Sequence, residues 1–454
     1  MKKKDIITVK IDGVRFPNKA YGFVDGEKVI VKNGVPGQIV SAQVIKKRGG
    51  NVEARLLEVT ERSELERQEG CCSHYEICGG CTYQTMKRQA ELDMKEQQVK
   101  TLLEDAGIHV ESWEGITPSP LETGYRNKCE FSFGDEVKDG PLALGMRKKM
   151  SHYEVVTLKD CNIVDVDFVT IVQGALAFFQ ERNVAFYHRM RYDGSLRHLV
   201  VRKGKATGEI LVHLVTTSDV PFSMEEFKNM ILALPLQGEI CGVLHSVNDG
   251  VADVVRSDEM TVLYGRDFFM EKLFDLEFKV SAYSFFQTNT EGAEKLYSIV
   301  REFAGDVENK MVFDLYCGTG TIGQIMAKAG SKKVMGIELV EEAVVAANEN
   351  AARNGLTNCT FLAGDVLKMV DELTDKPDVI IVDPPREGIH PKAIGKIIDF
   401  GAPEIVYVSC KPTSLARDLQ EFQAAGYEVK RVRLMDMFPR TVHVESVCLL
   451  SREG

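Results

Sequence analysis

The sequence lacks most features of membrane, secreted and disordered proteins. Only 14 of its 454 residues are proline, which argues against long Pro-rich linkers, and no run of 18 apolar residues occurs. A membrane-spanning helix needs about 20 mainly apolar residues, so none is predicted. The first residues, Met1 to Asp5, are mostly lysine and have no hydrophobic core of a secretory signal behind them. We therefore expect a cytoplasmic protein without membrane contact.

The composition is that of a folded chain with a large core. Hydrophobic residues make up 44% and charged residues 27% of the sequence, which suits about two to four domains. In a reducing compartment its 11 cysteines are not expected to form a disulfide framework. Scattered cysteines are then small core residues, whereas clustered ones are candidates for a metal or redox site.

The charge is unevenly distributed. The net charge is −11, which by itself argues against nucleic acid as a partner. Residues 1–60, however, carry 12 Lys and Arg against 6 Asp and Glu, or +6, so the remainder carries −17. A basic segment on an acidic body suits attraction to a phosphate backbone, although a solvated basic face is the simpler interpretation.

Residues 1–60 predict a small β-barrel. Short β-like segments such as Ile6 to Ile11 and Val52 to Val59 alternate with turn residues, including Gly26, Asn33-Gly34 and Gly49-Gly50. This alternation resembles the TRAM domain, an OB-like RNA-binding barrel. The resemblance implies that residues 1–60 bind RNA.

Two further parts are predicted, with a joint near residue 280. Residues 61–280 read as a central α+β domain, rich in β segments, that carries a cysteine cluster. From Ala282 onward, strand-like apolar runs alternate with helical patterns, which is typical of a parallel, doubly wound sheet. The predicted fold class is therefore multidomain α/β, with a Rossmann-like domain over residues 281–454.

A glycine turn opens the nucleotide-binding half of this last domain. Met311 to Leu315 predicts a buried strand, and Gly318, Gly320 and Gly323 allow close approach of a ligand and of the next helix. Read alone, this is also the G-x-G-x-x-G of a dinucleotide site. Glu338, at the end of the next strand, could hold a ribose in either case. A wider set resembles methyltransferases that act on nucleic acid and favours S-adenosylmethionine: Asp314, Gly364-Asp365 and Asp383-Pro-Pro-Arg386.

A lone thiol, Cys410, ends the apolar run Glu404 to Val408. Ligands of an open α/β sheet bind outside the carboxyl ends of its strands, so this thiol and Asp383 are predicted to share one crevice. A cysteine at a strand end is otherwise more often buried and inert. Three motifs in order resemble the RNA uracil-C5 methyltransferase family, and the resemblance covers nearly the whole chain: Asp383-Pro-Pro-Arg386, Ser409-Cys-Lys-Pro412 and His443-Val-Glu445.

The family's chemistry assigns a role to each residue type. Uracil C5 is a poor nucleophile, so a thiolate first adds to C6, and a carboxylate later removes the C5 proton. The resemblance implies that Cys410 is the nucleophile and Glu445 the base, although Glu445 also fits a salt-bridged strand carboxylate. We hypothesise that Lys411 favours the neighbouring thiolate. By resemblance, the contacts to S-adenosyl-L-methionine come from Gln287, Tyr316, Glu338 and Asp383.

A separate cysteine cluster predicts a metal centre. Cys72, Cys78 and Cys81 have C-x5-C-x2-C spacing, and Cys161 is a distant fourth thiol. Four thiolates suit either structural zinc or a [4Fe-4S] cluster, and this spacing favours iron–sulfur. The family resemblance, closest to its iron-sulfur and TRAM-containing 23S rRNA branch, also implies [4Fe-4S]. Four ligands would close the cluster, so we expect a structural or RNA-orienting role.

Basic segments in the middle of the chain predict an RNA path. They have aromatic residues beside some of their charges, which suits phosphate contacts and base stacking, although any one of them could be a solvated strand face. The segments are Tyr125 to Lys128, Met146 to Lys149 and His188 to Lys205.

Several functions fit these observations. The first is an enzyme, expected to be a monomer, that forms 5-methyluridine in 23S rRNA; tRNA T-loop uridine is the alternative substrate. The second is a non-catalytic RNA-binding or ribosome-assembly factor, against which the intact Cys410 and Glu445 argue. A cytosine-C5 methyltransferase is a third, but its nucleophile normally lies in a different loop.

Overall fold

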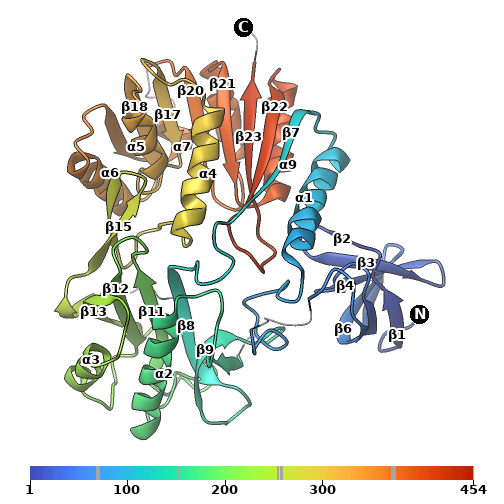
Figure 1. Cartoon of the computed structure of the whole chain (residues 1–454), viewed down its shortest axis with the longest axis vertical. Helices are drawn as coiled ribbons and strands as arrows, with labels where there is room; N and C mark the ends of the chain where they lie inside the picture. Colours follow the sequence, from blue (N-terminus) through green and yellow to red (C-terminus); the bar gives the residue numbers. More distant parts are fainter. Residues whose placement is uncertain (68–71, 152, 253–254, 256–258, 370–374, 453–454) are drawn as a thin grey trace.

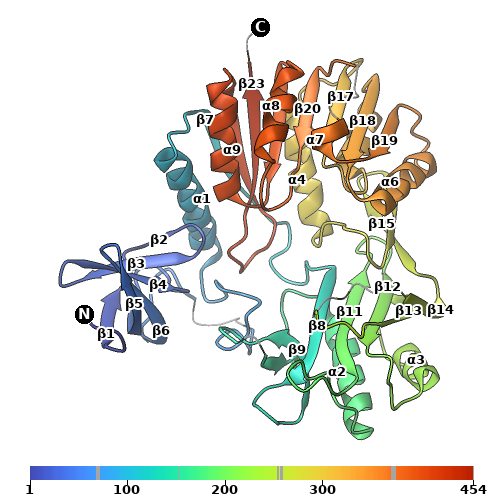
Figure 2. The same ribbon diagram turned by 180° about the vertical axis from the view of Figure 1, so that it is seen from behind.

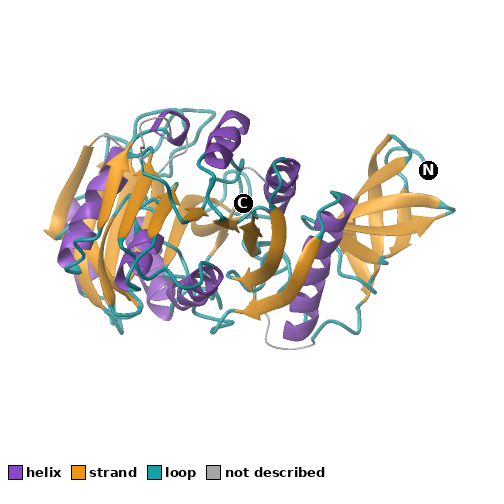
Figure 3. Ribbon diagram, turned by 90° about the horizontal axis from the view of Figure 1, so that it is seen from above, coloured by secondary structure: helices purple, strands orange, loops and turns teal. Residues whose placement is uncertain are grey.

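The computed structural model describes residues 1–67, 72–151, 153–252, 255, 259–369 and 375–452. Its first part, the N-terminal sheet, has the strand order β1-β5-β6-β4-β3-β2. Alternate residues such as Val29 and Val31 are buried on its inner side. The sheet lies at one end of the molecule (Figures 1 and 3). Its strands are β1 (Ile6–Lys10), β2 (Gly13–Arg15), β3 (Lys19–Val24), β4 (Glu27–Lys32), β5 (Ile39–Arg48) and β6 (Asn51–Glu61).

The central sheet has the strand order β10-β9-β8-β11-β12-β13-β14. Its middle strand β11 is buried along its whole length. Helix α2 packs its phenylalanines into the same core. The elements are β8 (Lys128–Asp135), β9 (Leu142–Arg147), β10 (Val155–Thr157), α2 (Val166–Glu181), β11 (Leu196–Lys203), β12 (Glu209–Thr216), α3 (Met224–Leu232), β13 (Glu239–Val247) and β14 (Glu259–Gly265). The hairpin β15 (Phe268–Leu273) and β16 (Leu276–Ser281) follows.

The C-terminal sheet has the order β19-β18-β17-β20-β21-β23-β22-β7, in which β17 to β21 are parallel. Parallel strands covered on both faces are apolar along their length, as Val379–Val382 is. The elements from the chain's last third are α4 (Thr290–Phe303), β17 (Met311–Leu315), α5 (Thr321–Lys328), β18 (Lys333–Glu338), α6 (Glu341–Arg353), β19 (Cys359–Ala363), α7 (Val366–Met369), β20 (Val379–Val382), α8 (Pro391–Asp399), β21 (Glu404–Ser409), α9 (Pro412–Ala424), β22 (Glu428–Asp436) and β23 (Glu445–Ser451).

Helices cover both faces of this sheet and make a three-layer domain. Helices α4, α5 and α6 share one hydrophobic core with the sheet (Figure 1). Helices α8 and α9 pack on the opposite face (Figure 2). The predicted α/β layering of residues 281–454 is therefore present, and the carboxyl ends of the parallel strands face the central sheet.

The boundary near residue 280 does not separate the packing units. Strand β7 (Val110–Pro118) pairs in parallel with β22 at the edge of the C-terminal sheet. Helix α1 (Arg88–Asp105) contributes Val99 and Leu103 to that domain's core. Residues 88–118, which the sequence suggested for the central part, therefore belong to the C-terminal layers. Across the described residues, no helix combines the length and apolar character needed to cross a membrane.

Candidate active site and cofactor crevice

The thiol and the carboxylate predicted for catalysis meet through strand pairing. Strand β21 pairs antiparallel with β23, and the last pair is Ser409 with Ser446. Cys410 follows Ser409 and Glu445 precedes Ser446, so both residues flank this last pair on the same side. The charge of Glu445 raises the pKa of Cys410, which also shows that the two groups lie close together. The two groups therefore meet at the carboxyl end of β21.

The loop after β20 brings Asp383 and Arg386 to the same place, and helix α9 holds this loop. The hydroxyl of Ser414 donates to the Arg386 carbonyl at 2.7 Å. The buried Asp418 accepts from the backbone N–H of Ile389 at 2.8 Å. Because α9 begins just after Cys410, one helix fixes both the nucleophile and the Asp383-Pro-Pro-Arg386 loop.

Cys410, Glu445 and Asp383 lie close enough for the negative charges of the acids to raise the pKa values of their neighbours. The pKa of the Cys410 thiol is raised to about 11, first by burial and then by the negative charges of Glu445 and Asp383, while Arg386 opposes this rise. Burial raises the pKa of Glu445 to about 8, with Asp383 again raising and Arg386 lowering it. The pKa of Asp383 is raised to about 7 by burial. Two acids and a thiol thus share a poorly solvated crevice.

Two residues of this site were not identified from the sequence. Arg386 lowers the pKa of Cys410, because the loop after β20 carries it to the thiol. Tyr297 on α4 is buried among the acids: its pKa is raised by burial first and then by Asp383. Arg386 was present in a motif already recognised, whereas a buried tyrosine on a helix carries no signal in one sequence.

The turn after β17 forms the predicted cofactor loop. Tyr316, Gly318 and Gly320 all have left-handed backbones, with φ of 64°, 54° and 72°. A Cβ added to Gly318 would meet nothing within 4 Å, so the turn leaves open space there. Glu338 at the end of β18 accepts from the Gly318 N–H at 3.0 Å. The carboxylate and the turn are therefore held side by side.

Unsatisfied polar groups in the crevice suit a polar, cationic ligand. The side chain of Asp314 accepts from Gly323 N–H at 2.8 Å through Oδ2, but its buried Oδ1 has no partner among the described residues. Burial, followed by Asp383 and Glu338, raises its pKa to about 8. The Gln287 side chain lowers the pKa of Tyr297, which Asp314 and Asp383 raise, so Gln287 lies near the same acids. These acidic, hydrogen-bond-accepting groups fit an adenosyl sulfonium cofactor.

The predicted cysteine ligands lie near one another beside the central sheet. Burial is the main cause that raises their thiol pKa values, and neighbouring cysteines add to it: Cys78 for Cys72, both of these for Cys81, and Cys81 for Cys161. All four are free thiols. Among the described residues, no three His, Cys, Asp or Glu side chains are gathered closely enough to hold a single metal ion. Cys71, a neighbouring thiol, lies outside the described residues.

Comparison with known proteins identifies the family. A family model for tRNA (uracil-5-)-methyltransferases matches residues 240–453. An RNA methyltransferase of Clostridium acetobutylicum, itself uncharacterized, is 48% identical over 453 residues, covering 100% of this chain and 99% of its own. The chain belongs to the RNA uracil-5-methyltransferase family. The predicted family and the methyltransferase fold are thus confirmed.

Two further relatives are similar to this chain over nearly its whole length. An uncharacterized RNA methyltransferase of Caldanaerobacter subterraneus is 47% identical and covers 100% of both chains. The crystal structure of Pyrococcus abyssi tRNA (uracil-54, C5)-methyltransferase in complex with S-adenosyl-L-homocysteine aligns with a TM-score of 0.78. It is 26% identical and covers 98% of this chain and 100% of its own. The similarity therefore includes the N-terminal and central parts.

The basic segments predicted to contact RNA have mixed roles in this family member. Lys203 is ion-paired with Asp165 and Asp167 at 2.9 and 2.7 Å, and Arg202 is buried and donates to the Ser284 carbonyl. These two therefore hold the central fold. Arg126 lies 5.9 Å from the ring of Phe438, a residue of the loop that leads to Glu445, so it contacts that loop.

A second group of basic residues comes together away from the crevice. Arg147, Arg189 and Arg197 line a small hollow of about 50 Å³ on the central domain. The segments around residues 147 and 189 were predicted separately from the sequence, and the folded sheet brings them to one place. Their guanidinium groups form a positive patch that suits a phosphate contact.

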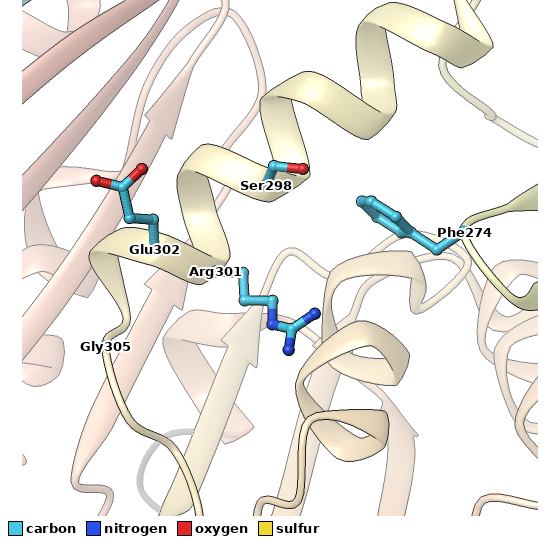
Figure 4. A pocket seen from close by; sticks show the side chains of 5 residues that line it. All are labelled: Phe274, Ser298, Arg301, Glu302 and Gly305. Atoms are coloured by element: carbon cyan, nitrogen blue, oxygen red, sulfur yellow. The ribbon is translucent and has the colours of Figure 1, made fainter.

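A surface hollow of about 410 Å³ is not part of the site. Phe274, Ser298, Arg301, Glu302 and Gly305 line it (Figure 4). It lies toward the C-terminal end of α4, whereas the loop 283–289 that contacts the crevice precedes the N-terminal end of this helix. Its size does not make it a candidate, because the acids and thiol that could perform chemistry are at the other end of the sheet.

Titration of the Cys410 thiol can distinguish the effect of Arg386 from that of Lys411. Arg386→Ala should raise the Cys410 pKa above about 11 and slow its alkylation at pH 8 by about threefold to tenfold, because a nearby cation favours the thiolate. Lys411→Ala is the matched control and should change the rate little. Iodoacetamide labelling of the Cys410 peptide, followed by mass spectrometry against pH, measures both. The opposite ranking would contradict the assignment.

Proposed function

We propose that this protein methylates C5 of a uridine in 23S rRNA with S-adenosyl-L-methionine as the methyl donor. The observation that carries the proposal is the close approach of Cys410 and Glu445 at the carboxyl end of β21, beside the cofactor loop. A nucleophile and a base placed together suit a reaction in which the thiolate adds to a planar substrate and the carboxylate then removes a proton from it. The target base must leave its stack to reach them.

Cys410 begins the reaction. Its thiolate adds to uracil C6, and the resulting enolate places electron density on C5, which then attacks the donated methyl group. The raised thiol pKa means that the resting enzyme holds mainly the neutral thiol. Arg386 is the side chain that favours the thiolate when substrate excludes water from the crevice.

Glu445 completes the reaction. After methyl transfer, C5 carries both the methyl group and a proton, and the Glu445 carboxylate removes that proton. Electrons from the C5–H bond then expel the thiolate from C6 and restore the uracil ring. The raised pKa of Glu445, about 8, makes this carboxylate a stronger base than an exposed glutamate, and activity should fall as the pH drops through this value.

The proposed cofactor contacts follow the crevice geometry. Glu338 and Tyr316 lie at the ends of neighbouring strands, with Gly318 between them, and suit the nucleoside part of the cofactor. Asp383 and Gln287 lie on the side of Cys410 and suit the sulfonium end. When bound, S-adenosyl-L-methionine supplies an electrophilic methyl group on a positively charged sulfur.

We also propose that Cys72, Cys78, Cys81 and Cys161 ligate a [4Fe-4S] cluster. Their mutual proximity and free thiols support this, and a cluster spaces its four sulfurs more widely than a single ion does. Lys149, which lowers the pKa of Cys78 and Cys81, places a positive charge beside a thiolate-rich group. The cluster's proposed role is structural.

The choice of 23S rRNA rests on the N-terminal sheet and the cysteine segment, whose TRAM-like and iron-sulfur interpretations remain predictions. The tRNA alternative has its own support, because the similar Pyrococcus abyssi enzyme is a tRNA (uracil-54, C5)-methyltransferase. The intact Cys410 and Glu445 pair argues against a purely non-catalytic RNA-binding or assembly factor. We propose that the enzyme is monomeric and cytoplasmic.

Methyl transfer to purified RNA tests the substrate. With labelled cofactor, we expect 5-methyluridine in 23S rRNA from a strain lacking the modification, and less label in unmodified tRNA. Cys410→Ala should abolish transfer, and Glu445→Gln should slow turnover by about 10²–10⁴-fold, as expected for loss of a general base. Cys359→Ala, at the far end of β19, is the matched cysteine control. Label in tRNA alone would replace the rRNA assignment, and label in 5-methylcytidine would refute the function.

Iron analysis tests the cluster. Anaerobically purified protein should contain about four iron and four sulfide per chain, as a [4Fe-4S] centre requires. Serine substitution at Cys78 should release the iron, whereas Cys241→Ser should not. Turnover should proceed without dithionite because no electron transfer is needed. Bound zinc, or a strict need for a reductant, would contradict this assignment.

A further inference from the structure

A buried network of charges lies beneath the catalytic loop, residues 437–444, which joins β22 to β23. Lys95 on α1 donates to Glu91 at 2.8 Å and to Asp436 at 2.6 Å, and all three are buried. Arg88 of the same helix forms another ion pair with Asp436. Charges are almost never fully buried unless they are paired, so this network fixes the start of the loop against α1. The proposed chemistry uses none of these groups.

Arg440 lies at the centre of the catalytic loop and is only 2% exposed. Its φ of 70° is uncommon for a residue with a Cβ atom. Its backbone N–H donates to Glu91 Oε1 at 2.7 Å, and its guanidinium donates to Glu91 at 3.1 Å, to Glu122 at 2.5 Å and to the Met86 carbonyl at 2.9 Å. The surrounding groups therefore hold a backbone conformation that the chain alone would not favour.

The carbonyl of Arg440 ties this loop to the cysteine segment, residues 72–83. It accepts from the backbone N–H groups of Thr82 and Tyr83, both at 2.9 Å. These two residues follow Cys81 directly, and the Tyr83 side chain is fully buried. The position of Cys81 and the position of Arg440 are therefore linked through two neighbouring hydrogen bonds.

The same loop also touches the other parts of the site. Asn289, two residues after Gln287, donates to the Met437 carbonyl at 2.7 Å. The Tyr125 hydroxyl donates to the Pro439 carbonyl at 2.9 Å. The loop ends where β23 begins, at Glu445. Each of its contacts thus bears on where that carboxylate is placed.

We propose that Arg440 is a positioning residue that couples the cysteine segment to Glu445. The arrangement of the cysteines, Cys81 in particular, then sets where the Glu445 carboxylate lies. This inference rests on the proposed function, in which Glu445 removes the C5 proton. The path runs from Cys81 through the Thr82 and Tyr83 amides to the Arg440 carbonyl, and from there along the loop to β23.

The proposal predicts which chemical step becomes slower when Arg440 is replaced. The Cys410–C6 bond and the C5–methyl bond form, with loss of the sulfur–methyl bond of the cofactor, before Glu445 takes the C5 proton and the thiolate leaves C6. A misplaced Glu445 therefore slows only the release step. The methylated RNA should then remain covalently attached to Cys410, whereas general damage to the fold would slow attachment as well.

Single-turnover kinetics with methyl-labelled cofactor tests this prediction on denaturing gels. In Arg440→Ala, release of the labelled adduct should slow by about tenfold or more while its formation changes less than about twofold. Arg440→Lys should restore the rate of adduct release only in part, because an ammonium keeps the charge but cannot reproduce the forked contacts of a guanidinium. The milder Glu122→Gln should show a smaller effect and keeps the test open if Arg440→Ala folds poorly. Arg433→Ala, on β22 and ion-paired with Glu302 at 2.7 Å, is the matched control and should not accumulate adduct.

Hydrogen exchange provides a readout that is independent of activity. Loss of the Arg440 guanidinium should speed exchange of the Thr82 and Tyr83 amides and of residues 437–445. Cys81→Ser should speed exchange of the same loop in an otherwise wild-type chain, and combining it with Arg440→Ala should add little. Arg433→Ala should leave the loop protected.

The outcomes separate this inference from the proposed function. Glu445→Gln must accumulate the adduct; if it does not, the assignment of the base is wrong, and the exchange experiment still tests the coupling. If Glu445→Gln accumulates adduct but Arg440→Ala behaves as wild type, the coupling alone is wrong. Equal slowing of formation and release in Arg440→Ala, with unchanged exchange in Cys81→Ser, would reduce Arg440 to an ordinary structural residue.

Discussion

The antiparallel pairing of β21 with β23 is the constraint on which the active site depends. It places Ser409 opposite Ser446, and the residues that flank this pair, Cys410 and Glu445, lie close together where the parallel strands end. A nucleophile and a base that act on adjacent carbon atoms of one ring must lie a few ångströms apart, and cross-strand neighbours meet that requirement. A change of one residue in register would send one of the two side chains to the opposite face.

Burial raises the pKa values of the acids and the thiol in the crevice, so their ionised forms depend on nearby positive charge. The crevice gathers carboxyl groups and a thiol whose pKa values are all raised, with the exposed Arg386 as the nearby cation that opposes this. Without a cation beside them, the ionised forms of these acids are poorly stabilised. A positively charged sulfonium would favour their ionised forms, so the electrostatics of the crevice suit the methyl donor more than the neutral thioether product.

The sequence was sufficient for the motifs but not for their assembly. The glycine turn, Asp383 and Cys410 could be placed at strand ends because parallel strands all finish at one edge. Their neighbours could not be derived: β7 joins a sheet whose other strands lie hundreds of residues away, and Arg440 acts through backbone contacts to Thr82 and Tyr83. Lys411 was favoured because it is adjacent in sequence, whereas Arg386 is adjacent in space. Long-range pairing of this kind leaves no local pattern.

The most direct test of the central claim uses RNA that contains 5-fluorouridine at the target site. Fluorine cannot be removed as a proton, so after methyl transfer the release step is blocked and Cys410 should stay bonded to C6. Digestion and mass spectrometry should find the methylated fluorouridine on the Cys410 peptide, and Cys410→Ala should form no adduct. An adduct on another cysteine, or complete turnover without any adduct, would contradict the account.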